Sequence, residues 1–313
     1  MPDVITAGET MVLGVPSAPG RLRHAAALEL KIGGAESNVA IALGRLGVSV
    51  GWTSFLGNDE VGQLVLDRIR GEGVDTSRVR RVPDLPTGLY LREIVAGSTR
   101  AYYYRSGSAA STMSPDAFDP AYLEGTKILH LTGVTPALSG DCADFVRWAA
   151  REARSRGVTT SFDVNYRSKL WPPGAAKSFA EELMPEVDLL FVGDDEARAI
   201  WGADDEEFAR SLAALGPREV VVKCGKTGCF ALAGDRVIRA SAFEVEEVDS
   251  VGAGDAHAAG YLAGVLWKRD VHERLRLANA LGAYSVMTLG DYEGLPGRKE
   301  LYSMMDGEED LGR

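Results

Sequence analysis

Hydrophobic residues along the chain recur with two periods, and segments of the two kinds alternate from the N-terminus onward. Short, mainly apolar runs predict a buried strand at 4–9 that ends in a turn, and a second strand at 50–55. Apolar positions at helix spacing predict a helix from residue 37 to 47 and another from 59 to 70. Because strand and helix alternate, we expect a parallel sheet with helices on both faces.

The same alternation resumes after residue 127. We expect strands at 128–131, 159–163, 187–192 and 219–223, and helices at 141–155, 175–184, 195–201, 253–267 and 271–287. The sequence contains no internal repeat, no low-complexity segment and no interdomain linker. It therefore predicts a single domain that spans residues 1–313.

Between these two regions the pattern changes to strands without helices. Residues 88–95 and 100–105 alternate in polarity and predict a β-hairpin, and short extended segments are expected at 11–15 and 28–32. A hairpin inserted in an α/β chain suggests a small sheet that stands off the main domain. We expect this small sheet to be formed by about 11–32 and 87–105.

Charge and cysteine content limit the class of protein. The 313 residues include 34 Lys and Arg against 45 Asp and Glu, a formal net charge of −11, which disfavours nucleic acid and anionic membranes as partners. Hydrophobic residues make up 45%, enough to fill a large core. Cys142, Cys224 and Cys229 form no C-x-x-C motif and predict reduced thiols. The start does not look like a signal peptide and no apolar run approaches membrane-spanning length, so we expect a cytoplasmic protein.

The segment from 248 to 264 carries the strongest candidate for chemistry. Its centre is Gly252-Ala253-Gly254-Asp255, between a segment expected to be extended (243–248) and an Ala/Leu-rich helix. Small residues at a helix start let a ligand approach the free backbone N–H groups, which attract anions together with the helix dipole. A carboxylate in that turn suits phosphoryl transfer to a hydroxyl. The alternative is that Asp255 only caps a buried helix.

Two motifs resemble signatures of the ribokinase-like (PfkB-type) sugar kinases. Asp249-Ser250-Val251-Gly252-Ala253-Gly254-Asp255 resembles the C-terminal signature, and Lys31-Ile32-Gly33-Gly34-Ala35-Glu36-Ser37-Asn38-Val39-Ala40 resembles the glycine-rich N-terminal one. The resemblance covers nearly the whole chain. It implies a three-layer α/β/α sandwich with a mostly parallel sheet, and a small β-sheet that acts as a lid over the sugar site.

The resemblance also implies an ATP-dependent kinase. In such an enzyme Asp255 removes the proton from the attacking hydroxyl. The N–H groups of Gly252, Ala253 and Gly254 hold the charge of the transferred phosphoryl group, and Mg²⁺ bridges the ATP phosphates. The family further suggests a monovalent cation such as K⁺ near Asp249. Because the small sheet has unpaired edges that a second copy would cover, we expect a homodimer or a larger even assembly.

Further matches narrow the resemblance to the 2-keto-3-deoxygluconate kinase branch of the family. They are Gly-Leu-Tyr-Leu-Arg at 88–92, Tyr-Tyr-Arg at 103–105, Asp-Val-Asn-Tyr-Arg at 163–167 and Gly-Asp-Tyr-Glu-Gly at 290–294. The implied reaction is phosphorylation of 2-dehydro-3-deoxy-D-gluconate to its 6-phosphate. The residues that the resemblance implies around this sugar acid are Gly34, Tyr90, Tyr103, Arg105, Arg167, Asp255 and Asp291.

A sugar acid needs a cationic partner for its carboxylate. A guanidinium binds planar oxyanions through two parallel hydrogen bonds, and Arg105 and Arg167 are the candidates. The alternative for each is an ion pair on the protein surface. A neutral sugar such as fructose or ribose remains an alternative substrate, and a non-catalytic nucleotide-binding sensor an alternative of another class. A dehydrogenase is disfavoured because no G-x-G-x-x-G follows the first strand.

A nucleotide site is expected after the strand that ends at Lys223. Gly225 and Gly228 suit a turn whose N–H groups approach phosphate, but the earlier glycine of a P-loop would fall at Val220, so we reject a P-loop. A tight β-turn is the alternative. In the family this segment lies along the nucleotide. The other residues that the resemblance implies near ATP are Asn165, Tyr166, Arg167, Gly193 and Asn279, the last with a satisfied buried amide as its alternative.

Glu196 is the candidate metal residue, and its motif departs from the family. Gly193-Asp194-Asp195-Glu196 stands where the family shows Asn-x-x-Glu, so Glu196 matches and Gly193 offers no side chain. Glu196 suits Mg²⁺ held through water, because Mg²⁺ keeps several waters. The alternative is an acid at a helix N-terminus. His257 stands where the family usually has Phe; we expect it to pack in the helix and to shift the Asp255 pKa slightly.

Overall fold

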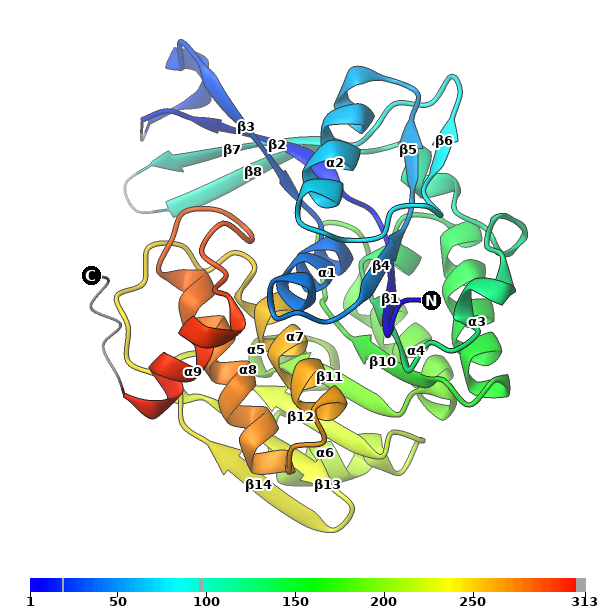
Figure 1. Cartoon of the computed structure of the whole chain (residues 1–313), viewed down its shortest axis with the longest axis vertical. Helices are drawn as coiled ribbons and strands as arrows, with labels where there is room; N and C mark the ends of the chain where they lie inside the picture. The colour runs from blue at the N-terminus through cyan, green and yellow to red at the C-terminus, as the bar shows by residue number, and fades with distance from the viewer. Residues whose placement is uncertain (19, 96–97, 308–313) are drawn as a thin grey trace.

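The computed structural model describes residues 1–18, 20–95 and 98–307, and a large sheet runs through it (Figure 1). This main sheet has eight strands in the order β14-β13-β12-β11-β10-β9-β1-β4. They are β1 Val4–Ala7, β4 Val50–Thr53, β9 Ile128–Thr132, β10 Thr159–Asp163, β11 Leu189–Gly193, β12 Glu219–Lys223, β13 Cys229–Ala233 and β14 Arg236–Ala240. The strands from β4 to β12 run parallel, and β13 and β14 add an antiparallel edge.

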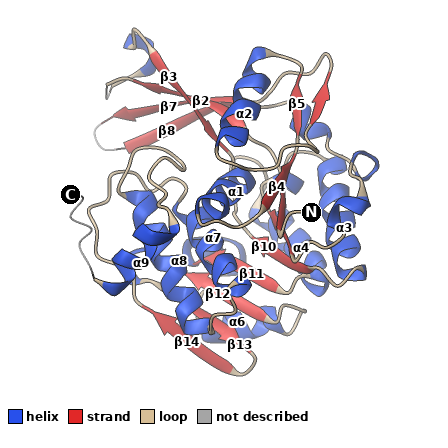
Figure 2. Cartoon of the chain, viewed as in Figure 1, coloured by secondary structure: helices blue, strands red, loops and turns tan. Residues whose placement is uncertain are grey.

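Helices cover both faces of the main sheet (Figure 2). One face packs against α1 Ala35–Arg45, α7 Ala253–Leu266, α8 Val271–Val286 and α9 Arg298–Asp306, and the other against α3 Gly140–Ser155, α4 Pro173–Leu183, α5 Asp194–Trp201 and α6 Glu206–Ala213. Successive side chains of a strand point to opposite faces, so Phe191 packs in the first layer and Leu190 in the second. The expected three-layer α/β/α fold is confirmed.

A second, four-stranded sheet stands off the main one, at the upper left of Figure 1. This small sheet has the order β3-β2-β7-β8, with β2 Met11–Pro16, β3 Leu28–Gly33, β7 Leu89–Val95 and β8 Ser98–Tyr104. β7 pairs antiparallel with β8 and parallel with β2. The strands lie where the alternation predicted them. Residues 96–97, between β7 and β8, lie outside the described part of the chain.

Strand pairing gives the small sheet two unlike faces. Tyr90 is opposite Leu13 on β2 and opposite Tyr103 on β8, so these three side chains share the inner face. Leu91 and Tyr102 are opposite each other on the outer face. Helix α2 (Glu60–Gly71) packs beside β2, near the point where the chain enters the small sheet (Figure 1).

Shorter elements complete the described chain. β5 Phe55–Gly57 and β6 Arg80–Val82 form a two-stranded sheet. Single 3₁₀ turns are η1 Leu22–His24, η2 Ala109–Thr112, η3 Pro115–Ala117, η4 Pro120–Leu123, η5 Thr135–Ala137, η6 Met184–Glu186 and η7 Gly225–Thr227. Within the residues described, no helix combines the length and the apolar content needed to cross a membrane.

One expectation from the sequence was wrong. The strand expected at 50–55 is divided, because β4 ends at Thr53 and β5 begins at Phe55 in another sheet, with Ser54 accepting a hydrogen bond from Arg80 between them. The segment 243–248 belongs to no helix or strand. It passes over a cavity beside α7 and α8 instead of pairing with β14.

Candidate active site

The first turn of α7 separates two cavities. Ser250, Ala253 and Gly254 line the first, which has a volume of about 390 Å³. Gly252 and Asp255 line the second, which has a volume of about 730 Å³. The main-sheet residues at this site stand at the carboxyl ends of parallel strands, the edge at which open α/β sheets bind ligands. One short backbone segment therefore faces both cavities.

Gly252 makes the turn into α7, and glycine is required there for two reasons. Its φ of 81° lies in the left-handed region. A Cβ at this position would also overlap the carbonyl oxygen of Asp291. The N–H groups of the following first turn have no acceptor within the helix and stand at the positive end of its dipole. Gly254 leaves this turn accessible, because the nearest atom to a Cβ placed there is Lys223 Nζ at 3.4 Å.

Asp255 is buried, and two carboxamides hold its carboxylate. Asn38 Nδ2 donates to Oδ2 at 2.9 Å, and Asn165 Nδ2 donates to Oδ1 at 3.0 Å. Burial raises the pKa of Asp255 above that of an ordinary aspartate, against the lowering effect of the Asn38 hydrogen bond. A raised pKa makes this carboxylate a stronger base than an exposed one.

A second buried carboxyl group, Glu36, lies close to Asp255. Thr132 Oγ1 and Thr135 Oγ1 each donate to Glu36 Oε1 at 2.7 Å. Burial raises the Glu36 pKa to about 7, and the nearby charge of Asp255 adds to the shift. Near neutral pH, a substantial fraction of the Glu36 carboxyl is therefore protonated, which limits repulsion of the Asp255 charge.

Tyr90 and Asp291 form one wall of the second cavity. Tyr90 donates to Asp291 Oδ2 at 3.2 Å, and its ring stacks on Tyr103 with centroids 5.4 Å apart. A Cβ at Gly33 would overlap both the Tyr90 hydroxyl and Asp291 Oδ2. Burial raises the Asp291 pKa to about 7, although the Arg92 guanidinium lowers it. Gly34 also lines this cavity.

Besides Arg92 of β7, three cationic side chains line the second cavity: Arg105, after β8, and Arg167 and Lys169, in the loop after β10. Arg105 forms an ion pair with the buried carboxylate of Glu9, which also accepts from Ser108 at 2.5 Å. Arg167 is half exposed, and its Nη1 is 4.0 Å from Glu196 Oε1. Lys169 donates to the Ala101 carbonyl of β8 at 3.1 Å. Arg105 therefore has a fixed internal partner, whereas Arg167 is held loosely.

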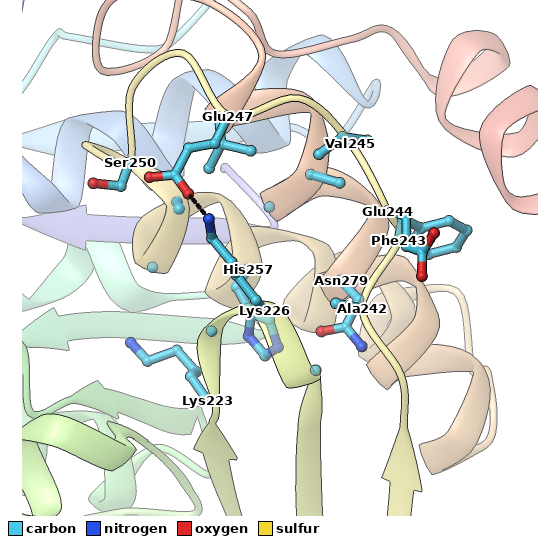
Figure 3. Close-up of a pocket in the computed structure, with 17 residues that line it drawn as sticks. Lys223, Lys226, Ala242, Phe243, Glu244, Val245, Glu247, Ser250, His257 and Asn279 are labelled. Carbon is cyan, nitrogen blue, oxygen red and sulfur yellow. Dashed lines mark ion pairs between the residues drawn. The ribbon is translucent and has the colours of Figure 1, made fainter. Parts of the chain in front are cut away.

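The first cavity, shown in Figure 3, lies between η7, the 243–248 segment, α7 and α8. Lys223 donates to both oxygens of Asp163, at 2.7 and 2.9 Å, and lines this cavity with Gly225 and Gly228. A Cβ at Gly228, where φ is 105°, would overlap the Ala240 carbonyl oxygen. The turn at 225–228 is thus a 3₁₀ turn followed by a required glycine, which agrees with the rejection of a P-loop.

Asn279 and His257 stand side by side in Figure 3 and line the same cavity. Asn279 Nδ2 donates to the carbonyls of Ala240 and Ser241, at 3.1 and 3.0 Å. Its amide N–H groups therefore fix the chain leaving β14. Burial lowers the His257 pKa to about 3, so its imidazole is neutral at physiological pH. His257 packs between α7 and α8, as expected.

Glu196 bridges the ends of two strands. Its Oε1 accepts the Tyr166 N–H and its Oε2 accepts the Gly193 N–H, both at 2.8 Å. Gly193 contributes its backbone N–H instead of a side chain, and a Cβ there would stand 2.7 Å from Asp195 Oδ1. In the described part of the chain, no cluster of three His, Cys, Asp or Glu side chains is arranged to hold a metal ion.

The two cavities divide the residues singled out in the sequence. The first contains Lys223, Gly225, Gly228, Ala253, Gly254 and Asn279, and the second contains Gly34, Tyr90, Tyr103, Arg105, Tyr166, Arg167, Gly252, Asp255 and Asp291. Asn165 contacts Asp255, whereas Gly193 and Glu196 line neither cavity. Tyr166, expected near ATP, and Arg167, expected near both ATP and the sugar acid, thus lie on the side of Asp255.

The polar residues of the second cavity that sequence reasoning missed include Glu9, Asn38, Arg92 and Lys169. Asn38 belongs to the glycine-rich motif at 31–40, and Arg92 follows Tyr90 on the same face of its strand, so both could have been found. Glu9 follows the end of β1 and Lys169 follows the end of β10, and no sequence motif marks either residue.

Comparison with known proteins agrees with this geometry. A model described as "pfkB family carbohydrate kinase" matches residues 1–298. The 2-dehydro-3-deoxygluconokinase of Bacillus subtilis (strain 168) is 36% identical over 311 residues, covering 98% of this chain and 96% of that protein. The 2-dehydro-3-deoxygluconokinase of Thermoproteus tenax is 34% identical over 311 residues, covering 97% and 94%.

A solved structure extends the agreement to the fold. The 2-dehydro-3-deoxygluconokinase of Thermotoga maritima superposes with a TM-score of 0.90 at 25% identity, covering 97% of this chain and 98% of that one. The match includes both the main sheet and the small sheet, since nearly all of each chain is covered. On these matches, and with a glycine-rich helix start dividing two cavities, the chain belongs to the pfkB family of carbohydrate kinases.

Proposed function

We propose that this chain transfers the γ-phosphoryl group of ATP to the 6-hydroxyl of 2-dehydro-3-deoxy-D-gluconate. One observation carries the proposal: the first turn of α7 faces two cavities, with Asp255 on one side and Gly254 on the other. Relatives over 30% identical across nearly the whole chain bear the name 2-dehydro-3-deoxygluconokinase, which supports this substrate.

In the proposed reaction the sugar occupies the second cavity. Its hydroxyl loses a proton to Asp255 as the oxygen attacks the γ-phosphorus, and the bond to the ADP oxygen breaks. The N–H groups of Gly252, Ala253 and Gly254 stabilise the negative charge that moves to the phosphoryl oxygens. The two carboxamides on Asp255 hold it toward the acceptor.

The acid group of the sugar is met by cations at the other end of this cavity. Arg167 is the stronger candidate for a direct contact, because its guanidinium is half exposed and has only a distant carboxylate partner. Arg105 is neutralised by Glu9 and supplies N–H groups rather than net charge. Gly34, Tyr90, Tyr103 and Asp291 surround the rest of the sugar.

The nucleotide occupies the first cavity. Backbone at Gly225 and Gly228 lies along the phosphates, with Lys223 near the α7 start and Asn279 beside the base. Tyr166 and Arg167 line the sugar cavity, and Asn165 stands beside the transferred phosphoryl group through its hydrogen bond to Asp255. Both Glu196 oxygens already accept backbone N–H groups, which leaves their outer lone pairs for water. That arrangement fits Mg²⁺ held through its water shell, and Mg²⁺ would neutralise charge on the ATP phosphates.

The small sheet acts as a lid over the sugar. Its inner face supplies Tyr90, Arg92 and Tyr103 to the second cavity, so movement of the sheet changes access to the sugar. A closed lid keeps water from competing with the sugar as the phosphoryl acceptor.

A second copy of the chain covers the outer face of the lid. Leu28, Leu30, Tyr102 and Tyr104 are exposed on this face, which makes it unusually apolar for a solvated sheet. Pairing two such faces in a homodimer, or in a larger even assembly, removes these side chains from water.

Two further expectations are retained as proposals. The enzyme acts in the cytoplasm, in keeping with its free thiols. A monovalent cation such as K⁺ binds near Asp249. Arg92 already forms an ion pair with the Asp249 carboxylate, so the cation adds to an existing positive charge there.

A substrate panel tests the proposal. ADP release is measured with 2-dehydro-3-deoxy-D-gluconate, fructose and ribose, for the wild-type chain and Arg167→Ala. We expect turnover of the sugar acid, and a rise of about tenfold or more in its KM in Arg167→Ala with kcat changed little. A preference for fructose or ribose would show that the substrate is a neutral sugar and not the sugar acid. ATP binding without turnover of any sugar would favour a nucleotide-binding sensor.

A further inference from the structure

Arg92 is buried on the inner face of the small sheet, yet it reaches the main domain. Its side chain is 2% exposed, and its Nη2 donates to Asp249 Oδ2 at 2.6 Å. Its Nη1 is 3.9 Å from Asp291 Oδ1. Arg92 Nε and Nη1 and Asp291 Oδ1 make no hydrogen bond within the described residues. One guanidinium of β7 thus stands between two buried carboxylates of the main domain.

Asp249 organises the turn that leads into α7. Its Oδ1 accepts the Val251 N–H at 3.3 Å, and its Oδ2 also accepts the Gly290 N–H at 3.2 Å. These bonds fix the two segments that meet where Gly252 lies against the Asp291 carbonyl. The position of the first-turn amides of α7 therefore depends on how Asp249 is held.

Tyr90 of β7 also reaches the main domain, through its hydrogen bond to Asp291 Oδ2, whereas two further polar contacts of the small sheet end elsewhere. Lys31 of β3 donates to the Leu289 carbonyl at 3.0 Å, and Lys169 donates to the Ala101 carbonyl of β8 at 3.1 Å. Neither reaches the residues at 249–252. Arg92 contacts the carboxylate that holds this turn, and both side chains are almost fully buried.

We propose that Arg92 is a positioning residue that couples closure of the small sheet to the geometry of the phosphoryl-binding amides at 252–254. When the sheet moves away, Asp249 is left as a buried carboxylate without its cationic partner, a state that proteins avoid. The turn at 249–252 then rearranges, and the amides no longer converge on the phosphoryl group. The coupling rests on the proposed function of the small sheet as a lid. Its effect is to limit transfer of the phosphoryl group to water while the lid is open.

Four variants separate this coupling from a merely structural ion pair: Arg92→Met, Asp249→Asn, the double variant, and Lys31→Met as the control. Arg92→Met leaves one buried charge unpaired and should lower Tm by about 10 °C and kcat by about 100-fold, with a smaller change in KM. The double variant removes both charges and should recover most of the Tm but not the kcat. Lys31→Met breaks another contact of the small sheet and should keep kcat within about threefold.

Two outcomes would overturn the proposal. One is kcat within about twofold of wild type in Arg92→Met. The other is recovery of kcat together with Tm in the double variant, since Arg92 would then only neutralise Asp249. Hydrogen exchange of the peptide covering 249–254 is measured as well, without substrates. It should accelerate in Arg92→Met and in the double variant but not in Lys31→Met. The hydrogen-exchange result does not depend on which sugar is the substrate. An error in the proposed reaction is therefore distinguishable from an error about Arg92.

Discussion

The Asn38 carboxamide donates a 2.9 Å hydrogen bond to Asp255, although 217 residues separate the two in the chain. Asn38 lies in the first turns of α1 and Asp255 in the first turn of α7, and these helices pack together on one face of the main sheet. The two family signatures of the sequence thus meet at one carboxylate. The glycine-rich motif near the N-terminus supplies a group that orients the base.

Replacement of Asn38 should shift the pH dependence of catalysis. The Asn38 hydrogen bond lowers the pKa of Asp255, so Asn38→Leu, which removes the donor at similar volume, should raise that pKa. The base is then protonated up to a higher pH, and the acid limb of kcat/KM should move to higher pH, with kcat about tenfold lower. A pH–rate profile checks this. An acid limb unchanged from wild type would contradict the assignment of Asp255 as the titrating base.

Gly252 should tolerate no side chain. Gly252→Ala combines a φ of 81° with an overlap between the new Cβ and the Asp291 carbonyl, so we expect a loss of roughly 2 kcal/mol or more in stability and at least tenfold in kcat. Gly254→Ala is the matched control for stability, because its Cβ meets only Lys223 Nζ at 3.4 Å. Urea unfolding of both variants measures the difference. Equal stabilities would show that the turn can relax.

Glu36 should make the protein less stable as pH rises. Its pKa is about 7 in the folded state against 4.5 for the unconstrained group, so between these values the folded state keeps a proton that the unfolded state has lost. The free energy of unfolding therefore falls as pH rises from about 5 to 7, by roughly 3 kcal/mol from this group. Glu36→Gln should flatten the curve in this window. If the free energies of unfolding of Glu36→Gln and wild type differ by the same amount at every pH, the raised Glu36 pKa is contradicted.

The outer face of the small sheet should control the assembly. Leu30→Glu puts a charge on the exposed apolar face, and we expect it to convert the proposed dimer to a monomer in sedimentation velocity. Leu215→Glu is the control, because Leu215 is similarly exposed but lies outside this sheet. A wild-type chain that sediments as a monomer at micromolar concentration would rule out this dimer.

The sequence was sufficient for most of the fold because its periodicity is set by burial. The strand at 219–223 contains a buried run of three valines, and its predicted bounds are those observed. The antiparallel strands β13 and β14 and the helices α6 and α9 were not predicted. β13 is buried and α6 is amphipathic, so both could have been found, whereas β14 and α9 are only partly buried and their local pattern is weaker.

The site was harder to predict, because partners depend on the tertiary structure. The motif at 252–255 located the base, and strand alternation put Arg92 beside Tyr90. No local pattern could show that Glu9 pairs with Arg105 or that Asp249 pairs with Arg92, since both pairs join the small sheet to the main domain. Nor could it show that Tyr166 lies on the sugar side of α7.

The central claim is that Asp255 accepts a proton as a phosphoryl group passes from ATP to a sugar acid. The direct measurement is kcat of wild type and Asp255→Asn with ATP, Mg²⁺ and 2-dehydro-3-deoxy-D-gluconate, with the phosphorylated product identified by mass spectrometry. We predict that the variant retains the wild-type Tm or exceeds it, because a buried charge is removed, and that kcat falls by at least about 1,000-fold. A folded variant with kcat near that of wild type would contradict the claim.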